Sequence, residues 1–101
     1  ILFSDKELAE ACMNPQAGQR RWGKSVYTKI VKRLSEFGAA ESLRDIATIK
    51  GARLEKLLGK RTGTMSVRVD DSMRIVFRTR PMPAPEKGEE ILILEVIDYH
   101  E

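Results

Sequence analysis

The spacing of the apolar residues changes near Gly63, and this change limits the possible folds more than any other feature of the chain. Before Gly63, apolar side chains recur with the period of one helix face. After it, apolar and polar side chains alternate, which is the period of one strand face. Helices first and strands later predict an α+β domain, in which N-terminal helices pack on one face of a small antiparallel sheet.

Three helices are expected before Gly63, over residues 5–13, 24–37 and 40–47. Ser4 and Glu7 match a capping box, so the first helix should begin directly after Ser4. The segment 14–18 contains Asn, Pro and Gly and should break this helix. Gly38 is a natural stop for the second helix.

Three strands are expected after Gly63, over residues 65–69, 73–78 and 91–97. The first two are separated by a short polar turn and should form an antiparallel hairpin that ends at Pro81. The third is nearly all apolar, so it should lie centrally in the sheet with both faces covered. Residues 1–3 are typical of a strand end, and residues 49–58 carry no clear pattern.

Length and composition indicate a single domain over residues 1–101. No apolar run approaches the ~18 residues of a membrane span, and no signal peptide is recognisable. Cys12 is the single cysteine and has no partner for an internal disulfide, which is typical of a reducing compartment. We therefore expect a cytoplasmic protein that does not enter a membrane.

Positive charge is concentrated in the middle of the chain. Residues 51–80 carry three acids and eight bases, which are Arg53, Lys56, Lys60, Arg61, Arg68, Arg74, Arg78 and Arg80. Residues 81–101 carry one base and six acids. A concentrated basic segment attracts polyanions such as nucleic acid. In the alternative interpretation, these cations are solvated or form salt bridges with the acidic tail.

The residue types exclude several kinds of site. One cysteine and one histidine cannot form a tetrahedral zinc site. The phosphate-binding loop of nucleotide hydrolases and the glycine-rich dinucleotide fingerprint are both missing, so we expect neither a metal nor a cofactor. Cleavage of RNA needs neither, because the 2′-OH of the substrate is the nucleophile. The protein then has to supply a base, an acid and positive charge for the phosphorane.

Candidates for these roles lie in the basic segment and in the last residues. The cations that could stabilise a phosphorane are Lys60, Arg61, Arg68 and Arg74. Histidine is the side chain whose unperturbed pKa lies near neutrality, so His100, the single histidine, is the candidate for proton transfer. Tyr99 could stack on a base. In the alternative interpretation His100 is solvated, Tyr99 is a core aromatic, and Arg74 pairs with Glu95 or Asp98.

Two motifs carry a more specific resemblance. Residues 57–77 read LLGKRTGTMSVRVDDSMRIVF, and Asp98, Tyr99 and His100 close the last strand. This combination resembles the HigB, or plasmid-maintenance killer, toxins of the RelE/ParE superfamily. Those proteins show Gly-x-Arg-x-Gly, then Ser-Ile-Arg-Val-Asn-Asp-x-Trp-Arg-Ile-x-Phe, and a final Asp-Tyr-His. The resemblance extends over about residues 20–100.

The resemblance implies a RelE-like fold and the toxin of a type II toxin–antitoxin pair. Such a toxin binds the 70S ribosome, cleaves mRNA in the A site by metal-independent attack of the 2′-OH, and so inhibits translation. Its inhibitor would be a HigA-like helix-turn-helix antitoxin. The residues to which the resemblance assigns catalysis are Asp98, Tyr99, His100 and Arg74. Those expected to bind RNA are Lys60, Arg61, Arg68, Arg53 and Met73.

The chain departs from the family pattern at several positions. Met73 stands where the usual residue is Trp, and Asp70 stands where it is Asn. Glu55 stands where some of these toxins have His, and its part in catalysis stays open. Two other functions also stay open. One is a ParE-like toxin that inhibits gyrase with the same fold, and the other is a non-catalytic basic module that only binds RNA.

Overall fold

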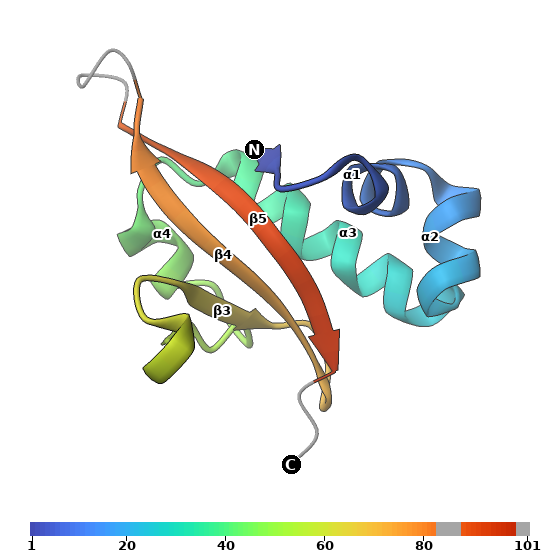
Figure 1. The fold of residues 1–101 in the computed structure, drawn as a ribbon. Helices are drawn as coiled ribbons and strands as arrows, with labels where there is room; N and C mark the ends of the chain where they lie inside the picture. The colour runs from blue at the N-terminus through green and yellow to red at the C-terminus, as the bar shows by residue number, and fades with distance from the viewer. Residues whose placement is uncertain (83–87, 99–101) are drawn as a thin grey trace.

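The computed structural model describes residues 1–82 and 88–98, and it contains helices packed on a five-stranded sheet (Figure 1). The elements are β1 (Leu2–Phe3), α1 (Lys6–Met13), α2 (Pro15–Trp22), α3 (Lys24–Ala39), α4 (Leu43–Ala47), β2 (Glu55–Lys56), the 3-10 helix η1 (Gly59–Arg61), β3 (Met65–Arg68), β4 (Met73–Pro81) and β5 (Glu89–Asp98). This arrangement confirms the predicted α+β class. Within the described ranges, no helix has the length and apolarity needed to cross a membrane.

The sheet has the strand order β1-β5-β4-β3-β2. All neighbouring pairs are antiparallel except β1 and β5, which run parallel. The sheet is therefore mixed, and the expectation of a wholly antiparallel sheet is wrong at this edge. The parallel pairing arises because residues 1–3 lie alongside the last strand. No local sequence pattern could indicate a pairing between the two ends of the chain.

The start of α1 corrects the predicted capping box. Asp5 is the N-cap, and its Oδ1 accepts a hydrogen bond from the backbone N of Leu8 at 2.8 Å. Ser4 instead donates its hydroxyl to the carbonyl oxygen of Leu94 at 2.9 Å and so ties the chain to β5. Both Ser and Asp can cap a helix. The pairing of β1 with β5 places the Ser4 hydroxyl against β5, so Asp5 is left to cap α1.

The segment after α1 was predicted to be a break, but it begins another helix. Asn14 Oδ1 accepts hydrogen bonds from the backbone N of Gln16 at 2.9 Å and of Ala17 at 3.3 Å. Pro15 occupies the first turn of α2, where its missing N–H costs nothing. At the next boundary, Gly38 does not stop α3, which continues to Ala39.

Gly18 allows α2 to lie close to both neighbouring helices. A Cβ at this position would lie 2.1 Å from Cδ1 of Tyr27 on α3 and 2.5 Å from the carbonyl oxygen of Ala11 on α1. No other residue type fits between these atoms without displacing backbone. The α1–α2–α3 unit therefore depends on one residue without a side chain.

The hydrophobic core lies between the helices and one face of the sheet. Phe77 on β4 packs against Phe37 on α3 with ring centroids 5.0 Å apart. The fully buried residues of this cluster include Ile30, Phe37, Ile46, Val67, Ile75, Phe77 and Ile93. On β3 and β4 these are alternate residues, as the sequence predicted, so the residues between them point to the opposite face.

A β-bulge changes which residues of β5 face the core. Val76 pairs with Glu95, whereas Phe77 pairs with Ile93, so Leu94 is the extra residue on β5. β5 lies between β1 and β4, as expected for a central strand. Its buried residues alternate with partly exposed ones, so the helices cover only one of its faces, and the expectation that both faces are covered is wrong.

The turn between β3 and β4 is closed by one carboxylate. Asp70 Oδ1 accepts hydrogen bonds from the backbone N of Met73 at 2.7 Å and of Ser72 at 2.9 Å. Partial burial is the largest single influence and raises the pKa of Asp70. The two backbone N–H groups, Lys29 and the Ser72 hydroxyl outweigh it, so the pKa lies below its ordinary value.

We expect Gly18→Ala to lower the free energy of unfolding by about 1–3 kcal/mol, because the methyl group overpacks the contact between α2 and α3. Gly38→Ala is the matched control. It lies within α3 with nothing within 4 Å of its Cβ position, so it should be neutral or stabilising by up to ~1 kcal/mol. Urea denaturation of both variants measures the difference. Equal effects would contradict the close approach at Gly18.

Asp70 should make stability depend on pH. Because its pKa is lowered in the folded protein, its contribution is present above the ordinary Asp pKa of ~3.9 and is lost as pH falls through the folded-state value. Asp70→Asn keeps an acceptor oxygen that does not titrate, so the gap between wild type and this variant should shrink from pH 6 to pH 3. Asp70→Ala should be less stable than Asp70→Asn by about 1 kcal/mol at both pH values. Urea midpoints at the two pH values provide the measurement, and a constant gap would overturn the prediction.

Candidate functional site

The sheet face that points away from the helices carries most of the polar side chains of the strands. Strand register places its residues in rows across the sheet, two of which include residues of β3, while Arg78 and Arg80 lie in further rows opposite Leu92 and Glu90. One row is Glu55, Ser66, Val76 and Glu95, and the next is Arg68, Arg74 and Ile97. We call this surface the open face. It contrasts with the apolar rows that line the core.

Arg74 on β4 is the central group of the open face and is only 9% exposed. Its Nε donates to Ser66 Oγ at 2.7 Å, and its Nη2 donates to the carbonyl oxygen of Arg53 at 2.7 Å and that of Ser66 at 3.3 Å. Glu55 Oε2 lies 3.7 Å from Nη2. A buried guanidinium is costly unless it is hydrogen-bonded and paired, and these contacts hold it in one orientation.

Arg53 contributes its backbone to this arrangement. Its φ is 45°, in the left-handed region that few residues with a side chain adopt. The carbonyl oxygen accepts from Arg74, while the side chain is exposed. The segment without a clear sequence pattern thus supplies an acceptor that the buried cation requires.

The loop between β2 and β3 brings two further cations to the open face. Lys60 and Arg61 lie in η1 and are exposed. Arg61 forms an ion pair with Glu95 on β5. Because β4 lies between β3 and β5, this pair bridges the loop and β5 across β4. Val76, in the same row as Glu95, is fully buried.

Two other residues predicted to bind RNA, Arg68 and Met73, flank the β3–β4 turn. Arg68 Nε donates to the carbonyl oxygen of Asp70 at 3.0 Å, and its Nη2 pairs with Asp71, so the side chain folds over the β3–β4 turn. Met73 is half-buried against the hydrophobic core, because it alternates with Arg74 along β4. The open face therefore collects Arg74, Arg68, Lys60, Arg61 and the Arg53 backbone, but not Met73.

The end of β5 lies beside Arg74. Arg74 pairs with Ile97, and Met73 pairs with Asp98, which is exposed. Tyr99 and His100 lie outside the described residues. The pairing of β4 with β5 thus brings the hairpin next to the last strand up to Asp98, and the catalytic roles stay a prediction.

Sequence reasoning missed the parts played by Ser66 and Glu95. Ser66 is fully buried and accepts from Arg74, although a serine within a strand is usually exposed on its polar face. The hairpin register could have indicated this contact. Ser66 is a diagonal neighbour of Arg74 across the two strands, and a long side chain can reach such a neighbour. Glu95 was considered as a partner of Arg74, but it pairs with Arg61.

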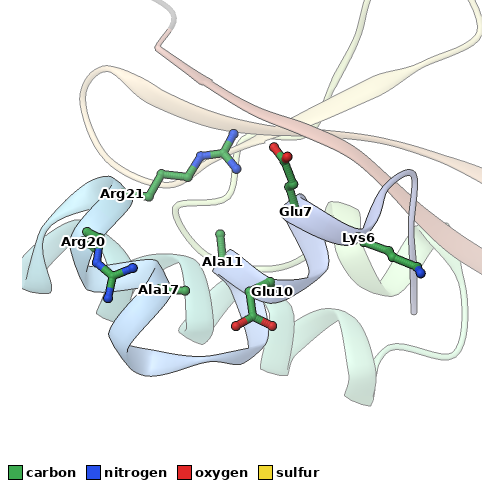
Figure 2. A pocket seen from close by; sticks show the side chains of 7 residues that line it. All are labelled: Lys6, Glu7, Glu10, Ala11, Ala17, Arg20 and Arg21. Atoms are coloured by element: carbon green, nitrogen blue, oxygen red, sulfur yellow. The ribbon is translucent and has the colours of Figure 1, made fainter.

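Other chemically suggestive groups lie away from the open face. Burial raises the pKa of the Cys12 thiol to about 11, against the opposing effect of Arg21, so it is a poor nucleophile. A cavity of about 360 Å³ lies between α1 and α2, and its lining includes Glu7, Glu10 and Arg20 (Figure 2). No predicted site residue lines it. Within the described ranges, no three acidic, His or Cys side chains form a potential metal site.

Comparisons with known proteins identify the family of the chain and agree with its fold. Residues 3–100 match the family described as RelE-like toxin of type II toxin-antitoxin system HigB. No curated protein matches the chain. Among solved structures, the YoeB/ParE toxin from Agrobacterium tumefaciens superposes with a TM-score of 0.63 at 14% sequence identity, covering 99% of this chain and 96% of that one. At this identity the structural likeness concerns the fold alone.

We expect Ser66→Ala to lower the free energy of unfolding by about 2–3 kcal/mol, because it leaves a buried charged donor of Arg74 without its acceptor. Ser72→Ala in the same hairpin is the control. Its hydroxyl contacts Asp70 at a weak 3.4 Å, so the loss should be under ~0.5 kcal/mol. Urea denaturation measures both variants, and similar losses would show that Ser66 does not hold the guanidinium.

Proposed function

Because the chain belongs to the HigB-like family of RelE-like toxins from type II toxin–antitoxin systems, we propose that it is a ribosome-dependent endoribonuclease. In this proposal it enters the A site of the 70S ribosome and cleaves the mRNA there, which inhibits translation. A HigA-like helix-turn-helix antitoxin neutralises it. The protein acts in the cytoplasm, where its ribosomal target is found.

The observation that carries the proposal is the buried guanidinium of Arg74 beside the end of β5. Catalysis of phosphodiester cleavage gains most from charge that is already in place when the phosphorane forms. A guanidinium held by Ser66 and the Arg53 carbonyl needs little reorganisation at that moment. Its charge is also screened less by water than that of an exposed side chain.

The proposed reaction follows from the chemistry of RNA. A base removes the 2′-OH proton, and the oxygen attacks the adjacent phosphorus. The resulting phosphorane is stabilised by Arg74. The 5′-oxygen then leaves with a proton from an acid, so a 2′,3′-cyclic phosphate and a 5′-hydroxyl remain. No metal is required for any step, because the substrate supplies the nucleophile.

His100 is the proposed proton-transfer group, and Asp98 and Tyr99 complete the motif beside it. Asp98, the described residue of this motif, pairs with Met73 on the strand of Arg74. Glu55, 3.7 Å from Arg74, is the carboxylate on the open face that could serve as the base. One histidine cannot act as both the acid and the base in the same step, so the reaction needs a second group that transfers a proton.

The remaining candidates grip the substrate in this proposal. Lys60 and Arg61 project from the exposed η1 loop and contact phosphates. Arg53 extends the same surface with its exposed side chain. Arg68 and Met73 lie toward the β3–β4 turn and would contact RNA only at its periphery.

We expect His100→Gln to abolish growth inhibition, because loss of a proton-transfer group lowers cleavage by about 10²- to 10⁴-fold. Glu101→Gln, one residue further along, is the matched control and should remain toxic. Mapping transcript 5′ ends after brief expression measures cleavage directly. Wild type and Glu101→Gln should yield codon-linked cuts, and His100→Gln should yield none.

The same experiment separates the competing functions. Codon-linked cuts that persist in His100→Gln would show that another residue transfers the proton. DNA damage without mRNA cuts would instead identify a gyrase inhibitor of the ParE kind. Ribosome or RNA binding without cuts in the wild type would leave a non-catalytic binding module.

A further inference from the structure

The loop that carries Lys60 and Arg61 holds its own shape. Leu57 N donates to the carbonyl oxygen of Thr64 at 3.0 Å and closes the base of the loop. Within it, Thr62 Oγ1 donates to the carbonyl oxygen of Gly59 at 2.7 Å. Residues 58–63 between these anchors are all exposed. The loop is thus a small hydrogen-bonded unit that projects from the sheet.

The two glycines at the tip of this loop border open space. Gly59 and Gly63 both have positive φ, and a Cβ at either position would meet nothing within 4 Å. In the part of the chain that the structure describes, the contact that ties the tip to the sheet is the ion pair between Arg61 and Glu95. The position of the loop tip over the open face therefore depends on that pair.

This ion pair is easily exchanged. The side chains of Arg61 and Glu95 are 46% and 40% exposed, and such surface pairs contribute little to stability. A guanidinium binds a phosphate in the same bidentate geometry as a carboxylate. The buried contacts of Arg74 are different, because they cannot be exchanged without disturbing the sheet. Arg61 is therefore suited to change partners, and among the arginines of the open face it is the one carried by the η1 loop.

We propose that Glu95 occupies Arg61 in the free protein and competes with RNA for it. When RNA binds, the Arg61 guanidinium exchanges the Glu95 carboxylate for a phosphate, and the η1 loop moves with it. Glu95 thereby weakens RNA binding and sets its affinity. This inference rests on the proposed function, because it requires RNA at the open face.

The test measures dissociation constants for two probes. One is a free single-stranded RNA with 2′-O-methyl groups, which cannot be cleaved, and the other is a 70S ribosome programmed with the same RNA. Glu95→Gln should tighten binding by about two- to fivefold, the equivalent of one exposed ion pair. Tightening on both probes points to the mRNA strand, and tightening on the ribosome alone points to ribosomal RNA.

Two comparisons separate exchange at Arg61 from a general effect of charge. Glu95→Gln in an Arg61→Gln background should have no effect, because the competing partner is gone. Glu90→Gln is the matched control, since Glu90 on β5 also pairs with an arginine, Arg80 at 2.5 Å, away from the loop. It should leave both affinities within measurement error.

Several outcomes would overturn the inference. Unchanged affinity in Glu95→Gln would do so, as would tightening that persists without Arg61 or that Glu90→Gln reproduces. In each of these cases the wild type still binds RNA, so the proposed function stands. A wild-type protein that binds neither probe would overturn both proposals together.

Discussion

The buried guanidinium of Arg74 is the interaction on which the arrangement of this protein's second half depends. It joins β4 to the side chain and carbonyl oxygen of Ser66 on β3 and to the carbonyl oxygen of Arg53. A charge in this environment is stable only while these acceptors stay in place. Arg33 does the same from the helix side, since its Nε donates to the carbonyl oxygen of Arg68 at 2.7 Å. The short strand β3 is thus held by a buried arginine at each face.

The two arginines at the centre of the proposed chemistry have opposite surroundings. Arg74 is buried and fixed, which suits the stabilisation of charge at one defined position. Arg61 is exposed on a loop with few contacts to the sheet, which suits the capture and release of a polymer. A long anionic substrate needs both properties, because it must be gripped reversibly and yet meet a rigid group at the bond that breaks. The open face carries both, with Arg74 on β4 and Arg61 on the η1 loop.

The sequence predicted a large part of the fold correctly, and the errors have identifiable causes. The alternation along β3 and β4 predicted that Ser66 and Arg74 point away from the core. The prediction that Ser4 caps α1 was wrong, and the helix that begins at Pro15 was missed. Several residues in each segment can cap a helix. The bulge at Leu94 was not foreseen, since an inserted residue leaves an apolar strand looking uniformly apolar.

For the candidate site, the sequence by itself determined which groups exist: a basic hairpin, one histidine, and a terminal motif shared with the HigB toxins. Only the tertiary structure decided the partners, because they come from residues far apart in the chain. Arg61 and Glu95 are 34 residues apart, and Arg53 reaches Arg74 through its backbone carbonyl, which side-chain identity cannot reveal. Arg74 is therefore fixed because it is buried, and Arg61 is exchangeable because it is exposed. The whole fold sets which side chains are buried.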